Sequence, residues 1–194
     1  MPCLAIHLAV AKKYLEKHNE DEKDFILGTI APDINLPDID KYIKGTSEDK
    51  KGHHFGNSIE TNSLIEYMKN KVNFELFFSY NDINTSFAKA YFLHLLCDYY
   101  FFGEYIKDER LKDLSLKEAI KVGYNDYNLI TPILINKYGL EVPDQIRDMM
   151  MQEGYGELQV LDLATVYRFI DEMSSLNLED EKIKRTSENK ISQL

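Results

Sequence analysis

The chain is poor in the residues that define several classes of protein. It has two cysteines, nine glycines, five prolines and no tryptophan in 194 residues. Cys3 and Cys97 lie far apart and outside any Cys-x-x-Cys pair, which argues against a disulfide scaffold. So little glycine and proline excludes a collagen-like or low-complexity chain.

Long hydrophobic runs are also missing. No segment approaches the roughly 18–20 uninterrupted apolar residues of a membrane-spanning helix. The short apolar stretch near the N-terminus has no basic residues before it and runs directly into Lys12 and Lys13, unlike a secretory signal. We therefore predict a cytoplasmic protein with no transmembrane segment.

Positive charge is scarce: 23 basic residues face 33 acidic ones, for a formal net charge of -10. A surface of this sign repels phosphate backbones, so non-specific nucleic-acid binding is not expected. With 44% hydrophobic residues, a chain of this length can bury the core of one domain.

Helical periodicity dominates and no alternating strand pattern stands out, which predicts an all-α fold. We expect one multi-helix domain over residues 1–174 and a polar, frayed C-terminal tail over 175–194. Helices are predicted over residues 6–18, 58–72, 74–80, 84–106, 116–137, 143–151 and 158–173, with a short apolar piece at 25–30. Asn84 and Thr85 are candidate caps and Gly139 is a stop signal. The polar stretch 35–52 is predicted to be a long loop of the kind that is functional or disordered.

His94 and Asp98 lie four residues apart in an apolar, aromatic helix, so their side chains project from the same face. A buried aspartate needs a compensating charge or several hydrogen bonds, and a metal ion is one such compensation. A core histidine bonded to its helical neighbour is the alternative.

Further candidate ligands are His7, Asp33 after Pro32, and His53 or His54 at the end of the polar loop. Singly, each has an ordinary interpretation as a core, turn or loop residue. Together with His94 and Asp98 they form a set of imidazoles and carboxylates without thiolate, which suits zinc and also iron or manganese. More than four such ligands permit two ions that share a bridging carboxylate.

These residues belong to an ordered set of motifs in the first half of the chain. The motifs are His7-Leu8-x-Val10-Ala11-Lys12, Leu27-Gly28-x-Ile30-Ala31-Pro32-Asp33, His54-Phe55 and His94-Leu95-Leu96-x-Asp98. As a set they resemble the bacterial zinc-dependent phospholipase C family, whose wider superfamily includes fungal single-strand-specific nucleases. The resemblance implies an all-helical fold around a metal cluster that hydrolyses phosphoric esters.

The resemblance also implies a role for each ligand. Asp33, His54, His94 and Asp98 would bind one ion, and His7 with Asp98 would hold a second, so that Asp98 is the bridge. The choice of His54 over His53 depends on its place directly before Phe55. Asp33 would also orient or deprotonate the attacking water, which makes it the candidate catalytic residue.

The chain departs from the family pattern in three respects. The family's N-terminal tryptophan ligand has no equivalent, because the chain has no tryptophan. The family's third ion uses further histidines, whereas no histidine follows His94 here. Carboxylates such as Glu104, Glu118 or Asp126 could substitute, and we prefer Asp126 because of its aromatic neighbours Tyr124 and Tyr127; the ordinary interpretation of each is a surface or cap residue. The membrane-engaging part of the toxin-type enzymes is not recognisable, so phospholipid is only one of the candidate substrates.

The leading hypothesis is a phospholipase C-like, metal-dependent phosphoric-ester hydrolase with two zinc ions, acting on a small phosphoester or a phospholipid. The alternative is a non-catalytic helical domain whose structural or regulatory metal site supports binding of a partner protein. The HD-domain phosphohydrolases are disfavoured, because no adjacent His-Asp pair occurs. The following tyrosines either line a pocket or pack in the core: Tyr91, Tyr99, Tyr100, Tyr124 and Tyr127.

Overall fold

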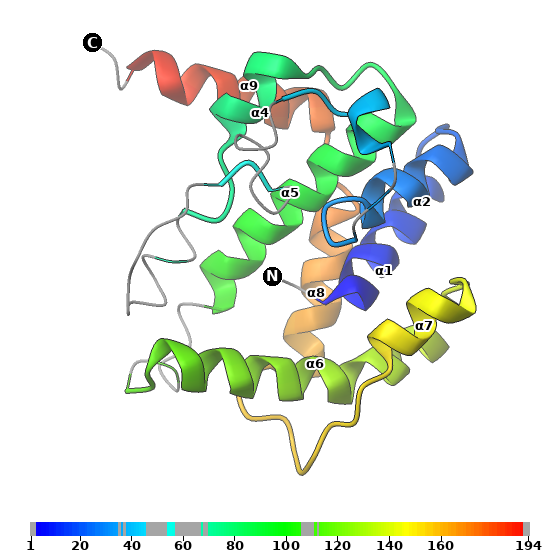
Figure 1. Ribbon diagram of the computed structural model, residues 1–194, viewed down its shortest axis with the longest axis vertical. Helices are drawn as coiled ribbons and strands as arrows, with labels where there is room; N and C mark the ends of the chain where they lie inside the picture. Colours follow the sequence, from blue (N-terminus) through cyan, green and yellow to red (C-terminus); the bar gives the residue numbers. More distant parts are fainter. Residues whose placement is uncertain are drawn as a thin grey trace.

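In the part of the chain that the computed structural model describes, the regular secondary structure is helical, apart from one isolated β-bridge between Phe55 and Val72. This part comprises residues 3–34, 36, 38–45, 54–56, 67, 70–105, 111 and 113–191, with the backbone alone at 102–105 and 188–191. The helices are α1 (Leu4–Leu15), α2 (Glu22–Ile30), the 3-10 turn η1 (Ile39–Lys41), α4 (Phe74–Tyr80), α5 (Ser86–Tyr105), α6 (Leu116–Tyr138), α7 (Asp144–Met150), α8 (Leu163–Met173) and α9 (Leu178–Ile191). The predicted all-α class is confirmed, and the helices form a single domain (Figure 1).

Helix α5 occupies the centre of this domain and packs against α1, α2 and α8 (Figure 1). The approach of α2 is the closest of these, and it depends on Gly28. A Cβ atom at Gly28 would lie 2.2 Å from the carbonyl oxygen of Phe87, so only glycine allows this contact. The close packing brings the C-terminal end of α2, with Thr29 and then Asp33, against the middle of α5.

Helix α1 is buried on nearly all sides, because it lies against α2, α6 and α8 as well as α5. Helix α6 crosses one end of the molecule, whereas α4 and α9 lie together at the other end (Figure 1). Among the described residues, no helix combines the length and the apolar character that crossing a bilayer requires.

The predicted signals at Thr85 and Gly139 are confirmed, and a further cap lies at the start of α6. Thr85 Oγ1 accepts a hydrogen bond from the N–H of Ala88 at 3.1 Å, so Thr85 caps the start of α5. Gly139 ends α6 in the left-handed conformation, with φ of 56°. Ser115 and Glu118 form a reciprocal capping box at the start of α6, which fixes its first turn.

Several predicted boundaries differ from the observed ones. The helix predicted over 6–18 is α1, Leu4–Leu15, and the apolar piece 25–30 is the end of α2, Glu22–Ile30. The helix expected over 158–173 begins at Leu163, because Asp126 accepts hydrogen bonds from the N–H groups at 159–161. The helix expected over 58–72 lies mostly outside the described residues, and its end, 70–72, is a turn in which Val72 forms a β-bridge with Phe55. The predicted loop 35–52 is described only at 36 and 38–45, and η1 lies within it.

The C-terminal segment also differs from its prediction as a frayed tail. Residues 178–191 form helix α9, which packs against α4. Arg185 on α9 is only 5% exposed, and its guanidinium donates to the Tyr100 hydroxyl at 2.6 Å. It also lies 4.4 Å from the centre of the Tyr99 ring. A polar sequence therefore docks through the buried Arg185, together with Leu178 and the ion pair of Lys182 with Asp82.

Candidate metal centre

Five of the predicted ligands come together at the centre of the fold. His7 comes from α1, Asp33 from the turn after α2, His54 from the segment 54–56, and His94 and Asp98 from α5. All are almost fully buried except Asp33, whose side chain remains 12% exposed. Two groups of these side chains, His7/His94/Asp98 and Asp33/His54/His94, are close enough to hold a metal ion.

Five distances among Asp33, His54, His94 and Asp98 are close to the edge length of a tetrahedral metal site. His54 Nε2 lies 3.3 Å from His94 Nε2, 3.0 Å from Asp98 Oδ2 and 3.5 Å from Asp33 Oδ1. His94 Nε2 lies 3.8 Å from Asp33 Oδ1 and 3.7 Å from Asp98 Oδ2. In a tetrahedral site with ligands about 2.0–2.1 Å from zinc, neighbouring ligand atoms are about 3.4 Å apart. Asp33, His54 and His94 are therefore spaced as one ion needs, and Asp98 lies within the same range of both histidines.

The tautomer of His94 follows from its other ring nitrogen. Nδ1 lies 2.8 Å from the carbonyl oxygen of Thr29, and because a carbonyl only accepts, Nδ1 is the donor. Nε2 of the neutral ring therefore presents a lone pair to the cluster. Burial, and then the charge of His7, lower the pKa of His94 to about 3, which keeps the ring neutral. An imidazole held by a backbone carbonyl is typical of a metal ligand.

His7 and Asp98 leave polar atoms without ordinary partners. His7 Nε2 lies 3.3 Å from Asp98 Oδ1, and the His7 ring stacks on His94 with centroids 3.7 Å apart. Within the described part of the chain, neither ring nitrogen of His7 and neither oxygen of Asp98 makes a hydrogen bond of normal geometry. Buried polar atoms of this kind are costly, and a cation at the cluster would satisfy them.

His54 is positioned by the residue that follows it. Phe55 is fully buried, adopts a positive φ of 60°, and packs edge-to-face on Phe77 with centroids 5.3 Å apart. Positive φ is strained for such a residue, so packing must hold it in place. Burial lowers the pKa of His54, but Asp98 and then Asp33 outweigh burial and raise it to about 9. The alternative residue, His53, lies outside the described residues.

The structure does not bring Asp126, the sixth predicted ligand, to the cluster. Its carboxylate accepts from the N–H groups of Val160 at 2.7 Å and Leu161 at 2.8 Å, and from that of Gln159 at 3.0 and 3.2 Å. Aromatic neighbours indicate its burial correctly, since Asp126 is 0% exposed. Its observed partners are backbone amides, so it anchors the loop before α8 in place of the predicted ligand role.

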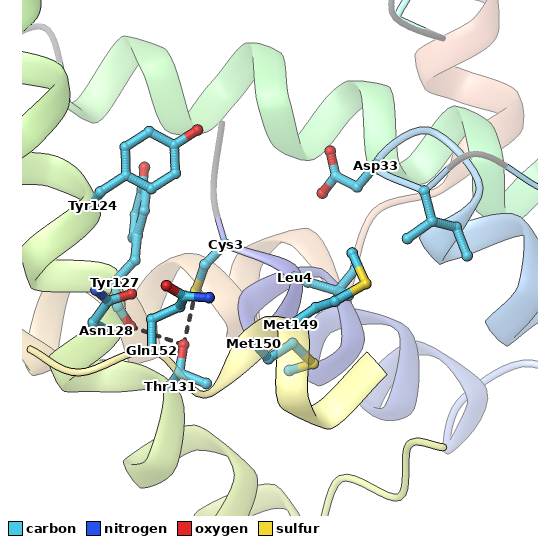
Figure 2. A pocket seen from close by; sticks show the side chains of 11 residues that line it. Cys3, Leu4, Asp33, Tyr124, Tyr127, Asn128, Thr131, Met149, Met150 and Gln152 are labelled. Atoms are coloured by element: carbon cyan, nitrogen blue, oxygen red, sulfur yellow. Dashed lines mark hydrogen bonds between the residues drawn. The ribbon is translucent and has the colours of Figure 1, made fainter. Parts of the chain in front are cut away.

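A pocket of about 540 Å³ adjoins the cluster at Asp33 (Figure 2). Its described lining is Cys3, Leu4, Asp33, Ile34, Tyr124, Tyr127, Asn128, Thr131, Met149, Met150 and Gln152. Of the five candidate tyrosines, Tyr124 and Tyr127 line this pocket, whereas Tyr91, Tyr99 and Tyr100 are not among its described lining residues. No motif marks Met149, Met150 and Gln152, which also line it. Burial raises the pKa of the Cys3 thiol, so this residue contributes an uncharged group.

Comparison with known proteins gives no relative: no family model, curated protein or solved structure matches the chain. The likeness of the motifs to zinc-dependent phospholipase C therefore remains a prediction. The cluster and the pocket beside it are the features of the molecule that point to a function.

Proposed function

We propose that the protein is a metal-dependent phosphoric-ester hydrolase. The observation that carries this proposal is the convergence of five imidazole and carboxylate side chains from four segments of the chain, one of which, Asp33, lines a pocket. Paired ions held by such ligands are a recurring device for phosphate-ester hydrolysis. Nitrogen and oxygen ligands without thiolate favour zinc, with iron and manganese as alternatives.

The orientation of Asp98 supports two neighbouring ions. Its Oδ2 faces His54 and His94, whereas its Oδ1 faces His7. His94 has one lone pair for the cluster, because its Nδ1 is bonded to Thr29, so His94 cannot bridge. Asp98 has two carboxylate oxygens and can therefore bridge two ions. Asp33, His54, His94 and Asp98 would hold the first ion, and His7 with Asp98 would hold the second.

The bound metal and Asp33 would have different tasks in the reaction. Bound zinc supplies Lewis acidity and lowers the pKa of water. Asp33 is the one member of the cluster that lines the pocket. Burial raises the pKa of Asp33, but His94 and then His54 outweigh burial and lower it, so Asp33 stays a carboxylate that can accept a proton from the attacking water. That water adds to phosphorus, the ester P–O bond breaks, and the proton that Asp33 has accepted from the water neutralises the leaving alkoxide.

A closed structural metal site is the second candidate function. His7, His54, His94 and Asp98 are each no more than 3% exposed. Four protein ligands around the first ion would complete a tetrahedron, which leaves no open position for substrate. In that case the domain would bind a partner protein through a surface that the metal stabilises.

Metal analysis combined with hydrolysis assays tests the proposal. Purified, untagged protein should contain at least about one equivalent of zinc, iron or manganese, and should hydrolyse p-nitrophenyl phosphate or its bis-ester. Asp98→Asn should lose both properties, whereas His18→Gln, a histidine stacked on Tyr14 outside the cluster, should keep both. Bound metal without hydrolysis of any phosphoester would favour the structural site. Wild-type metal content in Asp98→Asn would contradict both candidates.

A further inference from the structure

The pocket beside the cluster is uncharged apart from Asp33 among its described lining residues. This composition is unusual for a chain of which 29% is charged. Figure 2 shows Asp33 on one side of the pocket and Tyr124 and Tyr127 on the other. A substrate whose phosphorus lies at Asp33 would therefore extend its remaining part toward the uncharged wall.

The polar groups of that wall are partly committed already. The Thr131 hydroxyl donates to the carbonyl oxygen of Tyr127 at 2.8 Å, and the Asn128 amide donates to the carbonyl oxygen of Glu153 at 3.1 Å. The sulfurs of Met149 and Met150 are soft groups that make favourable contacts with aromatic rings. Such a wall offers contact area, but among the described residues it offers no cation to balance an anion.

We propose that this pocket binds the leaving group of the ester and selects one that is uncharged, with an aromatic ring preferred. The inference builds on the proposed hydrolase function and names its substrate class. An anionic leaving group would lose its hydration beside the Asp33 carboxylate without a compensating charge, which is costly. A volume of about 540 Å³ accommodates a substituted aromatic ring.

Met149 is the position at which to test the charge of the wall. Its side chain is 61% exposed, so a substitution there does not disturb the core. Met149→Lys places a cation at the pocket, and Met149→Leu is the matched uncharged control. Neither variant changes a residue of the metal cluster.

The two substrates differ in the charge of the para substituent, and the carboxylate also makes the phenol a poorer leaving group. The effect of the pocket is therefore measured as the change in the ratio between variants. We would compare 4-acetylphenyl phosphate with 4-carboxyphenyl phosphate on the metal-loaded protein. In each case water adds at phosphorus, and the products are the phenol and inorganic phosphate. The wild type should show kcat/KM at least about tenfold higher for the acetyl compound, and Met149→Lys should reduce that preference about tenfold or more. Met149→Leu should keep it.

A binding measurement separates this inference from the proposed function. Ligand-observed NMR with 4-hydroxyacetophenone and 4-hydroxybenzoate reports on the pocket in metal-free protein, where no hydrolysis is needed. Wild type should bind the first phenol in preference to the second, and Met149→Lys should shift the preference toward the second.

The outcomes are distinct. Hydrolysis of both esters at equal kcat/KM, unaffected by Met149→Lys, overturns the pocket inference and leaves the hydrolase. Selective phenol binding without any hydrolysis overturns the hydrolase and supports a pocket of this specificity. Neither hydrolysis nor selective binding overturns both.

Discussion

Asp98 on α5 and Asp126 on α6 are both fully buried, yet different groups offset the free-energy cost of burying the two carboxylates. The Asp126 carboxylate is saturated by backbone N–H groups of the loop before α8. The Asp98 carboxylate faces the imidazoles of His7, His54 and His94 and accepts no ordinary hydrogen bond from the described residues. Burial of an acid therefore does not by itself identify a ligand. A metal ligand is identified by the groups that the carboxylate oxygens face.

The sharpest test of this comparison is metal binding by matched amide variants. Asp98→Asn should lower metal affinity at least about 1,000-fold, or about 4 kcal/mol, because it removes the one carboxylate that faces both ligand groups. Asp126→Asn should keep the wild-type metal content, because its oxygens lie outside the cluster. Elemental analysis after dialysis against a weak chelator measures both. Equal losses in the two variants would mean that they act through general unfolding.

Metal removal should change the thermal stability of the Asp98 and Asp126 variants by different amounts. A ligand present at 1,000 times its dissociation constant stabilises the folded state by about 4 kcal/mol. Stripping the metal should then lower Tm by about 8–16 °C for a chain of this size. Removal of the metal should leave the Tm of Asp98→Asn unchanged. It should lower the Tm of Asp126→Asn by as much as that of the wild type. Differential scanning calorimetry with and without chelator gives the answer, and a chelator-insensitive wild type would contradict a bound metal.

Asp126→Asn should itself destabilise the protein by about 2–3 kcal/mol, since an amide nitrogen would now face backbone N–H donors in a buried site. Urea unfolding of metal-loaded protein measures the free energy of unfolding. The m-value should stay the same if only the anchored loop is affected. An unchanged free energy would mean that the loop does not depend on its anchor.

What the sequence could reveal differs between the two aspartates for a physical reason. His94 and Asp98 are four apart on one helix, so their proximity follows from local geometry, and the motif order identifies His7, Asp33 and His54 as further candidates. The backbone amides that donate to Asp126 lie 33, 34 and 35 residues after it in the chain, and no local sequence pattern indicates them. The same long-range bonds explain why α8 begins later than its predicted start.

Helix α9 is the clearest failure of local reasoning about the fold. Its sequence is polar, which is typical of a solvated tail, and only Leu178 and Arg185 are buried among its described side chains. Arg185 finds Tyr99 and Tyr100 on α5, and Phe74 on α4. These contacts depend on the tertiary arrangement of three helices. By contrast, the caps at Thr85 and Gly139 act within one turn and were predictable.

The smallest effect is expected at Asn125, the residue beside Asp126. Its amide donates to the Tyr155 carbonyl at 3.0 Å and accepts from the Tyr155 N–H at 2.9 Å, so it holds the same connection between α7 and α8. These bonds lie near solvent, where water can replace each lost partner. Asn125→Ala should therefore cost no more than about 1 kcal/mol, clearly less than Asp126→Asn, and should leave metal content unchanged. Urea unfolding beside Asp126→Asn measures the difference. Equal losses at the two positions would show that the number of bonds to the loop matters, and burial of the carboxylate does not.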